Sequence, residues 1–302
     1  MSPSKLDLDP GVVAACRHAA GAIAKQVSER IAGRTTVSVE RSVTRLLGID
    51  GADALEVPLP NVLVDHVHDG GGLGRGVAHW IGSAMLQTGK APQRIAEAVS
   101  AGELDLFAAG SSPAEDGAIR ERVTEETDRR LGEISRRFQQ RRTLRERLGE
   151  AATPLRYVLT ATGDVYEDVV HAKAVAQAGG DIVAVIRSTA QSLLDYVPYG
   201  PTTEGYGGTF ATQANFKIMR EAMDEWSQEH GRYVRLSSFC SGLCMSEIAV
   251  MGALEGFDNM VNDALYGILY RDINIVRGLI DQRVSRMING YFGVVINTGE
   301  DN

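Results

Sequence analysis

Apolar and polar positions follow two different rhythms along this chain, and the change comes near residue 150. Upstream, apolar side chains recur at helical spacing over residues 11–33 and over Val37–Leu47, which predicts two helices. Residues 111–149 are rich in arginine and glutamate, and their apolar positions are Ile119, Val123, Leu131, Ile134 and Phe138. These positions come at mostly helical steps, which predicts a mostly solvated helix that lies along another element.

The segment Val57–Asp65 reads as extended chain broken by two prolines, and the polar run His66–Gly76 follows it. One interpretation of this run is a metal site made by His66, His68 and Asp69, but on a strand the two histidines need a third ligand from elsewhere. A phosphate-binding glycine loop is a second interpretation, but the glycines lack a strand before them and a helix after them. A polar loop is favoured.

After Pro154 short apolar runs alternate with helical patterns. The predicted strands are Arg156–Gly163, Asp181–Arg187, Tyr233–Phe239, Met260–Tyr266 and Tyr291–Asn297, and the predicted helices between them are Val165–Gln177, Ala211–His230, Cys244–Leu254 and Ile273–Ile288. This alternation predicts an α/β fold of βα crossovers, either an open doubly wound sheet or a barrel. The chain therefore divides into a mainly helical region, residues 1–150, and an α/β part, residues 151–302.

Charge and composition narrow the classes of function. The net charge is −8, and acidic residues are interleaved with the arginines, so nucleic acid is not an expected partner. Three cysteines are too few for a disulfide framework. No apolar run approaches the roughly 20 residues that span a bilayer, and no targeting segment follows Met1, so we expect a cytoplasmic protein without a membrane partner.

Polar side chains recur just after each predicted strand from the second onward. They are Arg187, Ser192, Tyr196, Tyr199 and Tyr206 after the second strand, Ser237, Ser238 and Ser241 at the third, Asn262, Asp263, Tyr266 and Arg271 at the fourth, and Asn297, Thr298, Glu300 and Asp301 at the fifth. In a βα barrel these ends converge on one mouth. An arginine with serine hydroxyls suits an anion, and a tyrosine offers a face for a ring. Ion pairs, helix caps and core tyrosines are the alternatives at these positions.

Several long runs are more specific than any of these patterns. Asp181–Phe216, Asn262–Asn274 and Ile296–Asn302 resemble the large subunit of lysine 5,6-aminomutase, and the likeness extends upstream through Ser42–Asp65. The resemblance implies a TIM-like (β/α) barrel that binds pyridoxal phosphate. It is expected to be incomplete, because about five βα units are present and the family's large subunit continues beyond the segment matching Asn302. The cofactor-binding residues implied by the resemblance are Arg187, Ser192, Ser241, Tyr266 and Asp301, with Arg271 nearby.

The resemblance also implies a second subunit and a radical reaction. In this family the lysine that forms a Schiff base with pyridoxal phosphate, and the histidine that binds cobalt, belong to a small (beta) cobalamin-binding subunit. None of the six histidines here lies in an Asp-x-His-x-x-Gly motif, and none of the five lysines follows a predicted strand. The implied enzyme is a hetero-oligomeric isomerase that uses adenosylcobalamin to move the terminal amino group of lysine to the adjacent carbon. A truncated, non-catalytic barrel that retains partner or cofactor binding, and a related ornithine aminomutase, are the alternatives.

Overall fold

The computed structural model describes residues 8–108, 113–149, 151–185, 191, 194, 196–262 and 275–297. The chain divides into two compact units, Met1–Arg34 and Thr35–Asn302. In its described residues, 8–34, the first unit contains the helix α1 (Pro10–Ile31), where the Asp9 carboxylate accepts hydrogen bonds from the amides of Gly11 and Val12. This confirms the helix predicted over residues 11–33. The rest of this section concerns the second unit.

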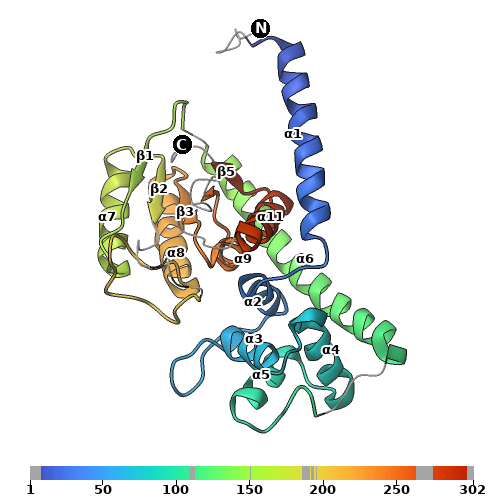
Figure 1. The fold of residues 1–302 in the computed structure, drawn as a ribbon. Helices are drawn as coiled ribbons and strands as arrows, with labels where there is room; N and C mark the ends of the chain where they lie inside the picture. The colour runs from blue at the N-terminus through green and yellow to red at the C-terminus, as the bar shows by residue number, and fades with distance from the viewer. Residues whose placement is uncertain are drawn as a thin grey trace. The chain divides into compact units, whose positions relative to one another are not determined.

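The second unit begins with a group of helices. They are α2 (Val37–Leu46), α3 (Leu59–Asp69), the 3-10 turn η1 (Leu73–Arg75), α4 (Val77–Thr88), α5 (Pro92–Ser100), the 3-10 turn η2 (Pro113–Glu115) and the long α6 (Asp116–Leu148). Helices α2 to α5 enclose a hydrophobic cluster whose fully buried members include Leu63, Ile81 and Ile95. Figure 1 shows these helices grouped together, with α6 running from them toward the sheet.

The prediction of an extended segment over Val57–Asp65 is wrong. The structure starts helix α3 at Leu59, with Pro60 in its first turn. The first amides of a helix have no intrahelical acceptor, so a proline costs nothing there and its fixed φ favours helix entry. Leu63, Val64 and Val67 are fully buried at helical spacing. The two prolines therefore mark the start of a helix.

The correction carries over to the polar run that follows. His66, His68 and Asp69 lie in the last turns of α3, neither on a strand nor in a loop, and His66 Nε2 lies 3.1 Å from Asp105 Oδ1. The irregular chain begins at Gly70. In the described part of the chain, no three histidine, cysteine or acidic residues are grouped closely enough to hold a metal ion.

The α/β part of the unit contains five strands with helices between them. In chain order its elements are β1 (Tyr157–Leu159), α7 (Val165–Gln177), β2 (Ile182–Val185), α8 (Gln213–His230), β3 (Arg235–Cys240), α9 (Met245–Glu255), β4 (Asn259–Asn262), α11 (Ile275–Tyr291) and β5 (Val295–Asn297). A strand is confirmed at each of the five predicted positions. β3 ends one residue later than predicted and β4 begins one residue earlier, while residues 186–187 and 263–266 of the predicted strands lie outside the described residues. The four predicted helices are confirmed to within three residues at every end.

The strand order decides between the two architectures left open by the sequence. All neighbouring strands are parallel, and their order in the sheet is β1-β2-β3-β4-β5. A doubly wound sheet reverses its order at a switch point, so that its helices cover both faces. This sheet has no reversal, and right-handed crossovers then put every helix on one face. The topology is that of a barrel with five of its strands described, as expected.

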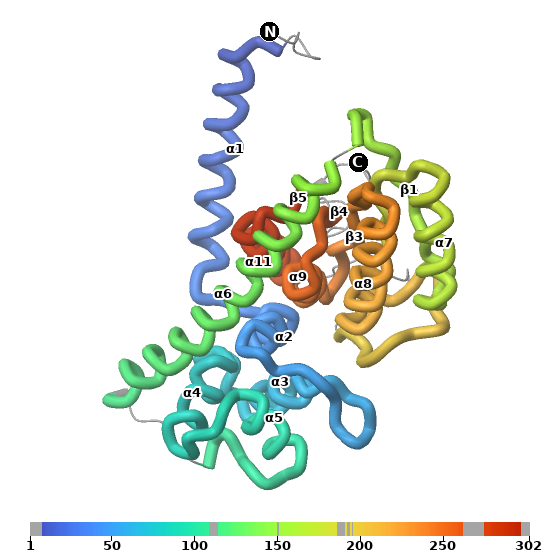
Figure 2. Tube along the Cα trace, turned by 180° about the vertical axis from the view of Figure 1, so that it is seen from behind, coloured from blue at the N-terminus to red at the C-terminus, as the bar shows by residue number. Residues whose placement is uncertain are grey.

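The helices follow the strands around the sheet in the same order. Helix α7 packs against α8, α8 against α9, and α9 against α11. Figure 1 shows this succession, and Figure 2 shows it from behind. On the helix-covered face, Val183, Leu236 and Cys240 join the main hydrophobic cluster. No helix in the described residues is long and apolar enough to cross a membrane.

The opposite face of the sheet is partly polar. Side chains alternate between the two faces of a strand, so Arg235, Ser237 and Phe239 of β3 point away from the helices. Ser237 pairs in register with Asn259 of β4, and the Asn259 amide donates to the Ser237 hydroxyl at 2.7 Å. This face corresponds to the interior of a barrel.

Helix α6 connects the two hydrophobic clusters. Near its start Ile119 and Val123 lie against Gly82 of α4, where an added Cβ would come within 2.6 Å of the Val123 side chain. Further along, Ile134 belongs to the cluster of the α/β part, and the Phe138 ring stacks on Phe292 at 5.8 Å. Only Ile119 and Ile134 of this helix are buried among its described residues, which confirms the prediction of a mostly solvated helix lying on other elements.

The contact between α8 and the residue that follows the C-cap of α9, Phe257, is a test of this core. Phe216 is fully buried, and its ring lies 4.4 Å from that of Phe257. We expect Phe216→Ala to lower the free energy of unfolding by about 3–5 kcal/mol, because it removes buried apolar contacts and leaves a cavity. Urea unfolding measures this. Tyr166→Ala, at an exposed position of α7, is the control, expected to change the free energy by about 0.5 kcal/mol or less. Equal losses in both variants would contradict the described core.

Candidate functional site around the start of helix α9

Of the six cofactor-binding residues implied by the resemblance, Ser241 is the one that the structure describes. It directly follows β3 and is fully buried. Strand alternation continues from Ser237 and Phe239, so Ser241 belongs to the face of the sheet without helices, at its carboxyl end. The other predicted site residues, Arg187, Ser192, Tyr266, Arg271 and Asp301, lie outside the described residues. Their grouping around a cofactor stays a prediction.

The chain makes a tight turn between Ser241 and helix α9. Gly242 has a φ of +81°, a left-handed conformation that residues with a Cβ adopt only with strain. Cys244 stands at the N-cap of α9 and makes no side-chain cap hydrogen bond. The first amides of a helix have no intrahelical acceptor and carry a partial positive charge, so they attract anions. A buried hydroxyl, a left-handed glycine and a helix start without a side-chain cap therefore form a strand–turn–helix arrangement suited to a phosphate group.

A buried ion pair lies in the first turn of the same helix. Arg45, in the last turn of α2, places Nη2 2.7 Å from Glu247 Oε1 of α9, and its Nε donates to the same oxygen at 2.7 Å. The two side chains are 4% and 0% exposed. The second carboxylate oxygen of Glu247 is buried without a hydrogen-bond partner. The pair thus attaches the helical group of the unit to the start of α9.

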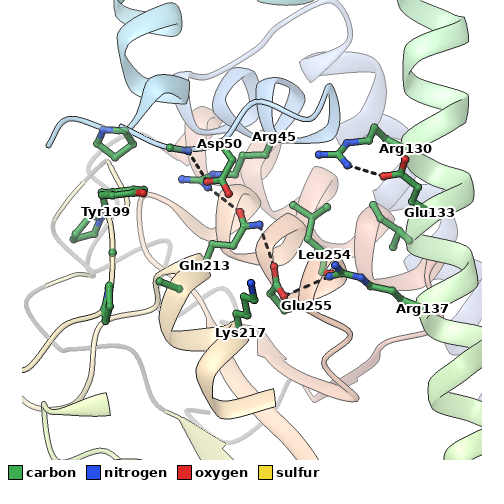
Figure 3. A pocket seen from close by; sticks show the side chains of 17 residues that line it. Arg45, Asp50, Arg130, Glu133, Arg137, Tyr199, Gln213, Lys217, Leu254 and Glu255 are labelled. Carbon is green, nitrogen blue, oxygen red and sulfur yellow. Dashed lines mark hydrogen bonds and ion pairs between the residues drawn. The ribbon is translucent and has the colours of Figure 1, made fainter. Parts of the chain in front are cut away.

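The ion pair continues into a chain of polar contacts, drawn in Figure 3. Arg45 Nη1 donates to Gln213 Oε1 of α8 at 3.1 Å, and Gln213 Nε2 donates to Glu255 Oε1 at 3.0 Å. Arg137 of α6 lies 3.4 Å from Glu255 Oε2 and also donates to the Leu254 carbonyl. Four helices, α2, α6, α8 and α9, are thereby joined by one network.

The network borders a cavity of about 580 Å³. Its lining includes Tyr199 from the loop after β2, Lys217 of α8, and the pair Arg130 and Glu133, which lie 2.6 Å apart. Figure 3 shows these side chains around the opening. Cations and carboxylates are mixed along the wall, so we interpret this cavity as a junction between helices.

Burial sets the titration of the acid at the end of this network. The pKa of Glu255 is raised above its ordinary value of 4.5, chiefly because burial disfavours the charged carboxylate. The positive charge of Arg137 and the hydrogen bond from Gln213 oppose this shift without cancelling it. Glu255 therefore binds its proton more tightly in the folded chain than an unfolded glutamate does.

Further polar contacts fix α2 against α11. The Thr36 hydroxyl donates to Asp281 Oδ1, and the Ser246 hydroxyl of α9 donates to the Asp281 carbonyl at 3.3 Å. Sequence reasoning missed this group and the Arg45–Glu247 pair. The sequence did contain one sign of a buried ion pair: Glu247 is an acidic residue within the apolar run Met245–Leu254. A charge on a buried apolar helix requires a partner of opposite charge.

Comparison with known proteins identifies the family. A model of the D-lysine 5,6-aminomutase TIM-barrel domain of the alpha subunit matches residues 6–302. The chain belongs to this aminomutase family. It is 54% identical to the lysine 5,6-aminomutase alpha subunit of Acetoanaerobium sticklandii over 300 residues, and 52% identical to that of Fusobacterium nucleatum over 299. Each match covers 99% of this chain and 57% of the relative, so the chain spans little more than half of their length.

A more distant relative has a different named substrate. The beta subunit of D-ornithine 4,5-aminomutase from Acetoanaerobium sticklandii is 36% identical over 137 residues, which cover 45% of this chain and 18% of that protein. The recognition of an aminomutase large subunit and of a TIM-barrel fold from sequence is thus confirmed.

The buried pair provides a test of the helix junction. We expect Arg45→Met to lower the free energy of unfolding by about 3–5 kcal/mol, because it leaves the Glu247 carboxylate buried without its cation. The double variant R45M/E247L removes both charges and should be less destabilised than R45M. Arg142→Met is the matched control, since Arg142 pairs with Glu146 at an exposed site where ion pairs contribute at most about 1 kcal/mol. A loss in R45M as small as that in R142M would count against the buried pair.

Glu255 provides a test by pH. Because the pKa of Glu255 is higher in the folded than in the unfolded chain, its protonated carboxyl stabilises the fold below pH 4.5. This stabilisation is lost as the pH rises through the pKa of Glu255 in the folded chain. Glu255→Gln mimics the protonated acid at every pH. The unfolding free energy of E255Q minus that of the wild type should therefore increase between pH 4.5 and pH 7, as measured by urea unfolding. A decrease over this range would mean that the pKa is lowered instead.

Proposed function

We propose that this chain is the pyridoxal-phosphate-binding barrel part of the large subunit of a lysine 5,6-aminomutase, an isomerase that moves the terminal amino group of lysine to the adjacent carbon. The observation that carries this proposal is the turn from Ser241 through Gly242 into α9, in a chain that belongs to the family. The proposed cofactors are pyridoxal 5′-phosphate and adenosylcobalamin. The proposed partner is a small cobalamin-binding subunit, in a cytoplasmic hetero-oligomer.

The residues around the start of α9 fit a phosphorylated cofactor. The Ser241 hydroxyl would donate to a phosphate oxygen, and the first amides of α9 would donate to others. Glu247 lies in the same turn, but its charge is balanced by Arg45 at 2.7 Å, so the helix start stays favourable to an anion. Arg187 and Ser192 are proposed as further phosphate contacts, Tyr266 as the ring-stacking residue, and Arg271 and Asp301 as polar contacts to the ring or substrate.

The chain's own part in the reaction is to bind and orient the cofactor and the substrate, and to exclude water from them. Bound pyridoxal phosphate supplies a carbonyl that carries the migrating nitrogen, and adenosylcobalamin supplies the radical that starts the shift. Helices α7, α8, α9 and α11 cover the outer face of the sheet, which keeps solvent away from that side. Ser237 and Asn259 satisfy each other's hydrogen bond on the inner face, so this part of the proposed cavity holds its shape without a ligand. The Schiff-base lysine is proposed to come from the small subunit.

The activity test mixes this chain with a small subunit of the family, both cofactors, and lysine or ornithine of each chirality. Lysine should give 2,5-diaminohexanoate, detected by mass spectrometry. Ornithine is included because the more distant relative is named for it. A second mixture adds the part of the relative's alpha subunit that this chain does not cover, since turnover only there would indicate a barrel that binds but cannot act alone. Failure of a soluble complex in both mixtures would refute the proposal.

The phosphate contact has its own test. We expect Ser241→Ala to weaken binding of pyridoxal phosphate about tenfold or more, because a hydrogen bond to a charged group contributes about 1.5–3 kcal/mol. Absorbance titration or equilibrium dialysis measures the change. Ser227→Ala is the matched control, a buried serine whose hydroxyl accepts from the Val234 amide near the amino end of β3. Unchanged cofactor binding in S241A would remove Ser241 from the site.

A further inference from the structure

Helix α11 holds the segment that runs from the end of β3 into α9. The two helices pack against each other, and Figure 2 shows them side by side. Arg277, Asp281 and Ser285 of α11 follow one another at intervals of four residues and therefore share one face of the helix. Each of the three contacts a different point of residues 240–246, the segment that contains Ser241.

Arg277 contacts the turn between Ser241 and α9 directly. Its Nη2 donates to the Leu243 carbonyl oxygen at 3.1 Å, and its side chain is 22% exposed. Arg277 lies in the first turn of α11, where the helix dipole disfavours a cation. The helix itself therefore gains nothing from this charge, and the role of Arg277 lies in what its guanidinium contacts.

The hydrogen bond from Arg277 orients one peptide plane of the turn. The Leu243–Cys244 peptide is trans, so its carbonyl and its amide point to opposite sides. Because the carbonyl accepts from Arg277, the Cys244 amide points away from that residue. The preceding residue is the left-handed Gly242, and glycine has more accessible backbone conformations than any other residue. Contacts from outside the turn are therefore needed to keep it in one shape.

Asp281 holds Arg277 in position. Its Oδ2 lies 3.7 Å from Arg277 Nε, and its side chain is fully buried. Asp281 is held in turn by the Thr36 hydroxyl, which donates to Oδ1, and by the Ser246 hydroxyl, which donates to the Asp281 carbonyl at 3.3 Å. A side chain locked by such contacts orients its neighbour more closely than an exposed one does. The carboxylate also balances the charge of Arg277.

Ser285 and Cys240 fasten the two ends of the same turn. The Cys240 thiol, at the end of β3, donates to the Met245 carbonyl at 3.0 Å. Its sulfur also lies 3.1 Å from the Ser285 hydroxyl oxygen, and both side chains are fully buried. The end of β3 and the start of α9 are thus tied to each other and to α11.

We propose that Arg277 is a positioning residue for the phosphate site at Ser241. It holds the Leu243–Cys244 peptide, and with it the path from Ser241 into α9, in the shape that receives a phosphate group. Since Asp281 balances its charge, Arg277 acts through the turn and not by attracting the anion itself. This inference rests on the proposed function, because the phosphate site is the one proposed above.

Pyridoxine 5′-phosphate and pyridoxine are the probes for this role. They differ only in the phosphate group, and without an aldehyde they form no imine with the lysines of the chain. Equilibrium dialysis with the full chain gives the ratio of their dissociation constants, which is the preference for phosphate. We expect Arg277→Met to lower this preference about tenfold, because the turn loses the geometry of its hydrogen bonds to a charged group. Pyridoxine binding should stay unchanged.

Three further variants control for a loss of stability. Arg277→Lys keeps a charged donor and should restore most of the preference. Arg283→Met is the matched control, since Arg283 is exposed on the same helix, and it should keep the wild-type preference. R277M leaves the buried Asp281 without this cation. If R277M does not fold, R277M/D281N replaces it with the same expected loss, because the new amide oxygen can still accept from Thr36.

The outcomes separate this inference from the proposed function. A wild type that prefers the phosphorylated compound, together with an R277M variant that keeps this preference, overturns the positioning role alone. Equal losses in R277M and R283M, or equal weakening of both compounds in R277M, also overturn it, because a general loss of structure would give the same result. A wild type that binds both compounds equally well refutes the phosphate site itself, and the role of Arg277 with it.

Discussion

The buried pair of Arg45 and Glu247 is the interaction on which the arrangement of this unit depends. Removing two charges from water is costly, and the cost is recovered only with close geometry and further hydrogen bonds. Arg45 meets both conditions. Its Nε and Nη2 each lie 2.7 Å from Glu247 Oε1, and its Nη1 donates to Gln213 Oε1. Because the partners come from α2 and α9, any relative displacement of these helices would leave a buried charge unpaired. The pair therefore specifies one position of the helical group against the barrel.

The sequence predicted the α/β part well, because its signals are local. The continuous apolar run of Asp181–Arg187 has one natural interpretation, a strand covered on both sides, and β2 forms within it. The barrel topology could not be predicted from such local patterns. It depends on which strands pair, and the order of five parallel strands follows from contacts between segments far apart in the chain. Only the resemblance to a known family favoured a barrel over a doubly wound sheet.

The error at Val57–Asp65 has the same origin. A proline disrupts a strand and also starts a helix, and the choice depends on whether the next turn is buried. Here Leu63 and Val67 pack into the cluster formed by α2 to α5, which no local pattern reveals. Strand ends and the resemblance predicted Ser241 for the candidate site. The partner of Glu247, Arg45, lies on α2 and could not be predicted from spacing.

The start of α9 connects these observations. A carboxylate in the first turn of a helix is stabilised by the aligned peptide dipoles, but it also cancels the partial positive charge that would attract another anion. Glu247 alone would make the turn after Ser241 a poor place for a phosphate. Arg45 neutralises the charge of Glu247, so this carboxylate does not cancel the partial positive charge at the start of α9. The contact that fixes the helical group is therefore also the one that keeps this helix start suitable for an anion. Under the proposed function, Arg45 therefore acts on the phosphate site of Ser241, although the two residues lie 196 positions apart in the sequence.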